Sequence, residues 1–319
     1  MKRRIMSMFL AVVMVLGLAP LLPTRGSAAA PTSGTCGENL TWTLDSDGTL
    51  TISGTGRMED YYSSYNRIVP WSSERTSIKK ISIEEGMTYI GAVAFSGCSS
   101  LTSVNIPSSV SSIGNSAFSD CSSLTSINIP NSVTYIGNYA FSGCSSLTSI
   151  NIPNSVSSIR GGAFHACSSL TSVNIPSSIS SIGDSAFEGC SILTSINIPS
   201  SVSSIGKDAF YKCSNLTSVN IHNISNFYSI NFNTPTSNPL CHGANLYLNG
   251  NLVEHLTIPD SVSSIRNYAF YGCSSLKSID IPNSVSFIGN SAFSGCRNLI
   301  SVNIPNSVSS IRSSSFYGC

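Results

Sequence analysis

A repeat of 23 residues restricts the possible folds of this chain more than any other feature of the sequence. The pair Ile-Pro begins at Ile106, keeps this step to Ile198, and returns with the same step from Ile258 to Ile304. Phenylalanine and cysteine keep the same step, with each cysteine three residues after its phenylalanine. A constant period of this length is typical of a solenoid, in which each coil buries its apolar side chains against its neighbours.

The positions within one repeat predict a strand, a second extended piece and a compact turn. Residues 101–106 have the apolar spacing of a strand, and Pro107 ends it because proline cannot donate to a ladder. Residues 110–113 form the second extended piece, and 115–122 has the spacing of one helical or 3-10 turn. Counting strands predicts ten coils. The predicted structural core includes Phe118, Phe141, Phe164, Phe187, Cys121 and Cys144.

The N-terminus predicts export from the cell. Residues 1–29 combine a basic start at 2–4, an apolar run over 6–22 and small residues suited to signal peptidase. A retained membrane anchor is the alternative, but Pro20 leaves the apolar run too short for a span. Without residues 1–29 the chain has 12 basic and 15 acidic residues. This charge argues against nucleic acid as a partner.

Residues 36–77 precede the array and lack its period. Alternating apolar residues flank Asp47-Gly48, which predicts a β-hairpin. The only two tryptophans, Trp42 and Trp71, lie in this segment and are expected to pack in a core. A solenoid closes the open end of its core with an atypical unit. We therefore expect 36–77 to be an N-terminal β-hairpin cap and 78–319 to be the repeat array.

The unit LTSVNIPSSVSSIGNSAFSDCSS resembles the BspA-like leucine-rich repeat, a 23-residue type found in bacterial surface antigens. The match covers 78–319 almost without gaps. The resemblance implies an α/β repeat solenoid: a right-handed coil with a parallel β-sheet on its concave face and short helical or 3-10 turns on its convex side. It also implies a secreted or surface-displayed adhesin whose partners are proteins, including host matrix or plasma proteins.

One coil breaks the period, because 37 residues separate Ile221 from Ile258. Within this 222–257 insertion, Asn249-Gly250 lies between apolar positions and predicts a hairpin with a tight primed turn. Insertions in solenoids commonly project at one edge and carry binding. A purely structural role is the other interpretation.

Polar strand positions form ladders of small uncharged side chains along the predicted concave sheet. Such a face suits protein partners with little electrostatic steering, and glycans are the alternative ligand. The candidate binding residues are Thr125, Ser126, Asn128, Ser149, Asn151, Asn174 and Asn197 on the strands, with Tyr247 and Asn249 in the insertion.

Other chemistry has little support in the sequence. The in-phase cysteines are expected to be buried thiols, although stacked coils would bring adjacent ones within reach of a disulfide. Three histidines, His222, His242 and His255, lie with Cys241 and Glu254 around the insertion, but their spacing does not match a zinc motif. Serines recur without a histidine and acid partner, so we expect no enzyme, metal or cofactor.

The chain ends at Gly318-Cys319 in mid-coil, with neither a polar capping unit nor an anchor motif. This predicts either the repeat portion of a larger surface protein or an open edge that docks a partner. The favoured function is a secreted or cell-surface protein-interaction scaffold. A glycan-binding module is the alternative.

Overall fold

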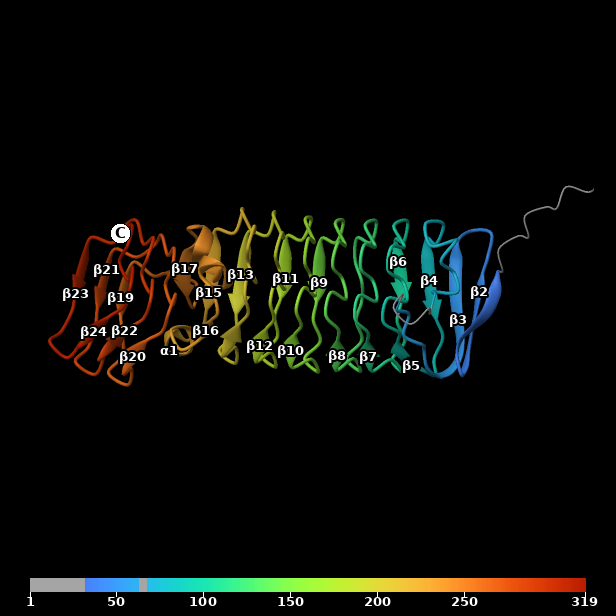
Figure 1. Ribbon diagram of the computed structural model, residues 1–319, viewed down its shortest axis with the longest axis horizontal. Coiled ribbons are helices and arrows are strands. Elements are labelled where there is room, and N and C mark those ends of the chain that lie inside the picture. The colour runs from blue at the N-terminus through green and yellow to red at the C-terminus, as the bar shows by residue number, and fades with distance from the viewer. Residues whose placement is uncertain (1–31, 63–67) are drawn as a thin grey trace, which may run out of the picture. The chain divides into compact units, whose positions relative to one another are not determined.

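The computed structural model describes residues 32–62 and 68–319, so the predicted signal peptide lies outside the described residues. The described residues form one compact unit. In Figure 1 its coils stack side by side, and most coils contribute one strand to each of two parallel ladders.

The first ladder holds the strands predicted from the Leu-x-x-Ile-x-Ile pattern. Neighbouring coils pair in parallel with a register of one repeat, as in Ser172↔Ser149 and Asn174↔Asn151. Its strands are β4 (Lys80–Ile83), β6 (Ser103–Asn105), β9 (Ser149–Asn151), β11 (Ser172–Asn174), β13 (Ser195–Ile198), β15 (Ser218–Ile221), β17 (Asn245–Leu248), β19 (His255–Thr257), β21 (Ser278–Asp280) and β23 (Ser301–Asn303).

The second ladder comes from the short extended pieces, and it too is parallel, as in Ile182↔Ile205. In most coils a proline separates the two strands, as Pro107 does between β6 and Ser112–Ile113, and the chain turns a corner there. The strands are β5 (Met87–Ile90), β7 (Ser112–Ile113), β8 (Tyr135–Ile136), β10 (Ser158–Ile159), β12 (Ser181–Ile182), β14 (Ser204–Ile205), β16 (Asn231–Phe232), β20 (Ser264–Ile265), β22 (Phe287–Ile288) and β24 (Ser310–Ile311).

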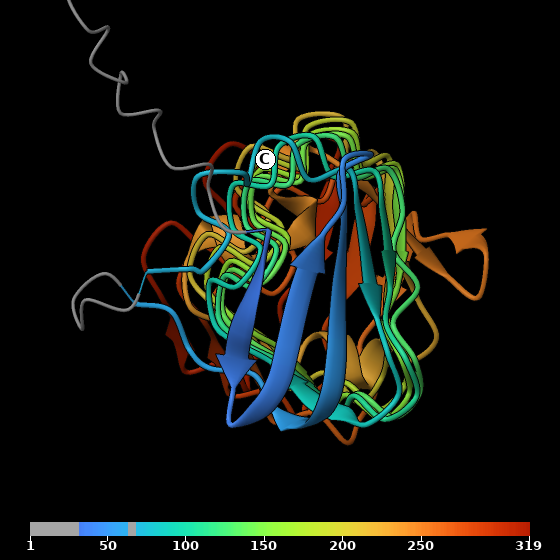
Figure 2. The same ribbon diagram turned by 90° about the vertical axis from the view of Figure 1, so that its right-hand side faces the viewer.

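Three strands precede the coils: β1 (Ser33–Gly37), β2 (Asn39–Leu44) and β3 (Thr49–Arg57). β2 and β3 form the predicted antiparallel hairpin, and β3 pairs in parallel with β4. Figure 2 views the molecule from this end. Trp42 and Trp71 are buried with ring centroids 5.6 Å apart, and Trp71 stacks on Phe95. The tryptophans therefore pack in the core, as predicted.

The third side of each coil differs in detail from the predicted helical or 3-10 turn. Alternate N–H groups make i→i−3 bonds, as from Ser119 to Ser116 O, while those between them reach the next coil, as from Phe118 to Ala140 O at 2.8 Å. Ser116 and Asp120 have φ values of 52° and 58°. This left-handed backbone conformation turns the second set of N–H groups toward the next coil. A helix cannot form where every second N–H is bonded to another coil. We call this side the Phe turn.

The apolar residues that recur in each repeat form the buried core. Phe118 and Phe141 stack with ring centroids 5.5 Å apart and planes 3° from parallel, and similar stacks join Phe95 to Phe210 and Phe270 to Phe316. Each stack leaves almost no exposed ring surface except at the last coil. Phe118, Phe141, Phe164 and Phe187 each stack between two other rings and are buried, as the repeat predicts.

The in-phase cysteines form a second buried line, which we call the cysteine column. Its buried members are Cys98, Cys121, Cys144, Cys167, Cys190, Cys213, Cys273 and Cys296. The thiols are free, and each typical member donates to a carbonyl of the preceding coil, as from Cys167 Sγ to Phe141 O at 3.2 Å. Burial raises the pKa of the Cys167 thiol to about 12. The predicted burial as thiols agrees with the structure, and burial is the main reason why these thiols stay protonated.

Candidate binding surface

The predicted strand-face residues are placed on one continuous face of the first ladder. Thr125, Ser126, Asn128, Ser149, Asn151, Asn174 and Asn197 are all exposed there. Residues 125–130 have no assigned strand, although Thr148 N donates to Thr125 O at 3.1 Å and keeps that coil in register. The structure therefore brings these candidates together, while Tyr247 and Asn249 lie farther along, in the insertion.

Many hydroxyl groups on this surface are already bonded within the protein. Thr148 Oγ1 donates to Thr125 O, and Thr171 Oγ1 donates to Thr148 O at 3.0 Å. At a corner of the coil, Ser132 Oγ likewise donates to Val110 O at 2.7 Å. These bonds tie each coil to the one before it. Sequence reasoning treated the hydroxyls as free and missed this role, for which the exact 23-residue phase was the available signal.

The amide groups of the first ladder interact with each other as well. Asn174 Nδ2 donates to Asn151 Oδ1 at 3.3 Å. A partner could still bind the remaining lone pairs and N–H groups of such a ladder. However, between residues 101 and 221 the strand positions of this face carry no charged side chain and nearly the same residues in every coil. Charged side chains occur only toward the ends of the ladder, as Lys80 in β4 and Asp280 in β21. The irregular coil is the place where the residues depart from the repeat.

The 222–257 insertion begins as an irregular coil rather than as a loop outside the array. It contains α1 (Ile224–Phe227), the 3-10 helices η2 (Pro235–Ser237) and η3 (Pro239–His242), and β18 (Asn251–Leu252). β16 pairs with β14, and β17 pairs with β15, so both ladders extend into the insertion. Phe227 packs against Phe232 and Phe270, where the regular phenylalanine stack is interrupted.

The predicted hairpin is present where the insertion leaves the array. β17 and β18 pair antiparallel through a two-residue loop, Asn249-Gly250, with φ values of 50° and 80°. Positive φ at both loop positions is the primed turn that Asn-Gly favours. His222 Nδ1 lies 3.2 Å from Asn249 Oδ1 and ties the loop back to the preceding coil. Figure 2 shows this orange hairpin standing away from the stacked coils.

The two ladders are both interrupted after the hairpin. Among the strand pairs of the described residues, none joins β16 to β20 or β17 to β19. A buried side chain, Asn238, connects the two parts instead: its Nδ2 donates to Tyr268 O and Ala269 O at 2.7 and 3.0 Å, and its Oδ1 accepts from Leu240 N. The insertion is thus also a junction within the array.

A cavity of about 410 Å³ lies beside the hairpin, and we call it the hairpin pocket. Its apolar walls come from Ile224, Leu248, Leu252 and Leu256, and its polar rim includes His255 and neighbouring asparagines. Leu252 is 43% exposed although it is a large apolar residue. The His255 ring is held by Ser278 Oγ at 2.6 Å from Nδ1.

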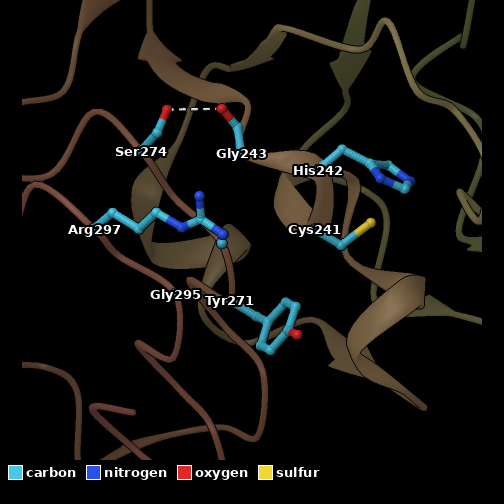
Figure 3. A pocket seen from close by; sticks show the side chains of 8 residues that line it. Cys241, His242, Gly243, Tyr271, Ser274, Gly295 and Arg297 are labelled. Carbon is cyan, nitrogen blue, oxygen red and sulfur yellow. Dashed lines mark hydrogen bonds between the residues drawn. The ribbon is translucent and has the colours of Figure 1, made fainter. Parts of the chain in front are cut away.

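A second cavity of about 410 Å³ lies at the end of η3, and we call it the Arg297 pocket. Figure 3 shows the Arg297 side chain extending toward Gly243 and Tyr271, while the His242 ring points the other way. His242 Nε2 lies 3.1 Å from Phe210 O, so this nitrogen is the protonated donor. Ser274 Oγ donates to Gly243 O at 2.7 Å. Sequence reasoning did not single out Arg297.

The three histidines around the insertion have separate partners: Asn249, Phe210 O and Ser278. In 32–62 and 68–319, no group of three His, Cys, Asp or Glu side chains is placed to hold a metal ion. One serine does meet a histidine, because Ser142 Oγ lies 3.3 Å from His165 Nδ1. Neither residue lines the hairpin pocket or the Arg297 pocket. The contact therefore has no substrate cavity of that kind beside it.

No helix within the described part of the chain has the length and apolar character needed to cross a bilayer. A search of curated proteins gives no match.

Solved structures with the same fold come from several bacteria. A leucine-rich cell surface protein of Faecalibacterium prausnitzii is 27% identical with a TM-score of 0.52, covering 91% of this chain and 80% of that one. A leucine-rich repeat protein of Bacteroides ovatus is 25% identical with a TM-score of 0.44, covering 88% and 91%. The pneumococcal vaccine antigen PcpA is 20% identical with a TM-score of 0.50, covering 89% and 73%.

The family is given by the sequence of the coils themselves. The protein-family model described as the BspA type leucine-rich repeat region matches this sequence in six copies, over residues 72–192, 135–238 and 243–319. These ranges include most of the parallel ladders and both ends of the insertion. The chain belongs to the BspA-type leucine-rich repeat family.

Proposed function

We propose that the protein is a secreted or cell-surface scaffold that binds other proteins as an adhesin. The binding surface is the outer face of the first ladder together with the 222–257 insertion. Host matrix and plasma proteins are the expected partner class. The similarity to a cell surface protein of Faecalibacterium prausnitzii supports the location.

The hairpin pocket is the observation that carries this proposal. Protein interfaces gain most of their binding energy from a few large side chains that fill apolar pockets inside a polar rim. The hairpin pocket has this composition, with leucine walls and a rim of asparagine and histidine side chains. Its volume of about 410 Å³ suits one large apolar side chain of a partner. The adjoining first ladder supplies hydrogen-bonding groups for the rest of the contact.

Charge has a small part in this binding mode. The only ion pair of the described residues near the hairpin joins Lys277 Nζ to Glu254 Oε1 at 2.7 Å, and it leaves the local charge balanced. Electrostatic steering should therefore be weak, and affinity should change little with salt concentration.

A charge placed in the hairpin pocket tests the proposal. Wild-type protein should bind at least one member of a panel of immobilised matrix and plasma proteins with a saturable response in biolayer interferometry. Leu252→Asp should weaken that binding at least about tenfold, because a carboxylate would be buried against apolar walls. Ser263→Asp, at an exposed position beside β20, is the matched control. A flat response across the panel, or equal binding by all three proteins, would contradict the proposal.

The first ladder and the glycan alternative need separate variants. Ser126→Asp should weaken protein binding if the ladder belongs to the same interface. Signal on an array of neutral glycans that disappears when Asn128, Asn151 and Asn174 are replaced by alanine would favour the glycan module instead. Protein binding that survives these alanine substitutions would favour the hairpin.

A further inference from the structure

Arg297 occupies a corner position that serine holds in the other regular coils. There the serine hydroxyl donates to a carbonyl of the preceding coil, as from Ser168 Oγ to Ser145 O. In the Arg297 coil the following residue makes this bond, because Asn298 Nδ2 donates to Ser274 O at 2.8 Å. The guanidinium is therefore not needed to hold the coils together. The serines are Ser99, Ser122, Ser145, Ser168, Ser191, Ser214 and Ser274.

The space in front of Arg297 exists because of glycine. Gly243 ends η3 with φ 83°, and a side-chain carbon there would meet no atom within 4 Å. Gly272 lets the insertion approach the next coil, since a side-chain carbon at that position would lie 2.5 Å from Leu240 O. The result is the Arg297 pocket of about 410 Å³, bounded by three successive levels of the array.

The lining of this pocket favours a negative charge. No aspartate or glutamate is among the described residues that line it, and the ion pairs recorded for those residues do not include Arg297. Cys241 also lines the pocket, but burial raises the pKa of its thiol to about 12, so it is uncharged at neutral pH. One unpaired guanidinium thus faces a polar hollow without an opposing anion.

We propose that the Arg297 pocket binds a carboxylated monosaccharide, such as a uronic acid. A guanidinium pairs with a carboxylate through two parallel N–H···O bonds, a geometry that lysine cannot reproduce. The volume suits one sugar ring rather than an extended chain. The Ser274 proton is used within the protein, on Gly243 O and Asn245 Oδ1, so Ser274 Oγ and Gly243 O offer their remaining lone pairs to ring hydroxyls. The phenol of Tyr271 adds an aromatic face and a donor.

This site is separate from the hairpin pocket and does not depend on the proposed protein binding. The experiment uses the chain without the predicted signal peptide, residues 1–29. Binding of glucuronic acid is followed by saturation-transfer NMR and calorimetry. Arg297→Ser restores the residue of the other coils and should leave the fold intact. Arg266→Ser removes an exposed arginine elsewhere and gives the same change in net charge.

Wild type and Arg266→Ser should bind glucuronic acid equally, and Arg297→Ser should bind at least about tenfold more weakly. Tyr271→Phe should weaken binding by a smaller factor. Glucose, which has the same ring without the carboxylate, should give no signal. The proposal is overturned by absent binding of glucuronic acid, by equal binding of glucose, by equal binding of Arg297→Ser, or by preference for a glutamate-containing peptide.

Discussion

Replacing thiols of the cysteine column by serine should make the protein more resistant to alkali. In the folded chain each column thiol is buried, and the proton of Cys167 is held by Phe141 O. Burial raises the pKa of that thiol to about 12, whereas an unfolded chain has cysteines with pKa of about 8.5. The unfolded state therefore loses these protons first as pH rises. The stabilisation is complete below pH 8.5 and is lost as the pH rises toward the folded pKa.

The size of the effect follows from the number of thiols. At pH 10 a thiol that ionises only in the unfolded chain lowers the free energy of unfolding by about 2 kcal/mol. Six buried members of the column would together remove about 12 kcal/mol, as much as the whole stability of a typical domain: Cys98, Cys121, Cys144, Cys167, Cys213 and Cys296. A serine hydroxyl can donate the same bond but does not ionise in this range. The triple substitution Cys144→Ser, Cys167→Ser and Cys190→Ser should therefore retain about 6 kcal/mol more at pH 10.

Urea unfolding at pH 8 and pH 10, followed by circular dichroism in a reducing buffer, measures this difference. The quantity to compare between variants is the decrease in the free energy of unfolding from pH 8 to pH 10, because serine also changes the stability at pH 8. A control variant places serine at the adjacent alanines Ala140, Ala163 and Ala186. Ser315 shows that a coil accommodates serine there, buried and bonded to Gly289 O. If the thiol variant loses as much stability as wild type, the buried thiols do not control the alkaline limit.

Four further substitutions test the packing. Phe164→Ala should lower the free energy of unfolding by about 3–5 kcal/mol, because this ring stacks on a ring at each side. Phe316→Ala should lower it by clearly less, because Phe316 is half-buried and stacks on one ring at the last coil. Equal losses of stability in urea unfolding would contradict this difference in stacking. Gly250→Ala should cost about 1 kcal/mol at φ 80°, with faster amide exchange confined to the hairpin. Asn238→Ala should leave the carbonyls of Tyr268 and Ala269 unsatisfied, and each should lower the free energy of unfolding by about 1–3 kcal/mol. Amide hydrogen exchange in 255–319 should become faster. Unchanged exchange there would refute the connecting role of Asn238.

The fold was predictable because each apolar position of the repeat has the same structural role in successive coils. Val110 and Phe118 are buried wherever their position recurs except in the last coil, and the Asn249-Gly250 pair predicted its turn from backbone geometry alone. The Phe turn was less predictable. Its Ala-Phe-x-x-Cys spacing fits a helical turn equally well, and only the neighbouring coil decides where each N–H is bonded. Positive φ at Ser116, which is not a glycine, gives no signal in the sequence.

The candidate site was predicted only in its location. The sequence placed recognition at the insertion, but neither pocket there could be foreseen, because each joins residues from several coils whose contacts depend on how the insertion packs. Arg297 shows this best: it is 40 residues after the end of the insertion, in a coil of normal length. Its environment becomes polar and open only because Gly243 and Gly272 lie against it in space.

The regular coils also explain why specific binding should depend on the irregular one. A stack of identical coils is stable when each polar group of the surface bonds the next coil, and Thr148, Thr171 and Ser132 are used in this way. A group that holds the array together is less available to a partner. Where the insertion interrupts both ladders, side chains lose their partner in the next coil, and apolar and charged groups such as Leu252 and Arg297 are left facing cavities. The same break in the repeat that weakens the ladders therefore supplies the groups with which this protein can distinguish its ligands.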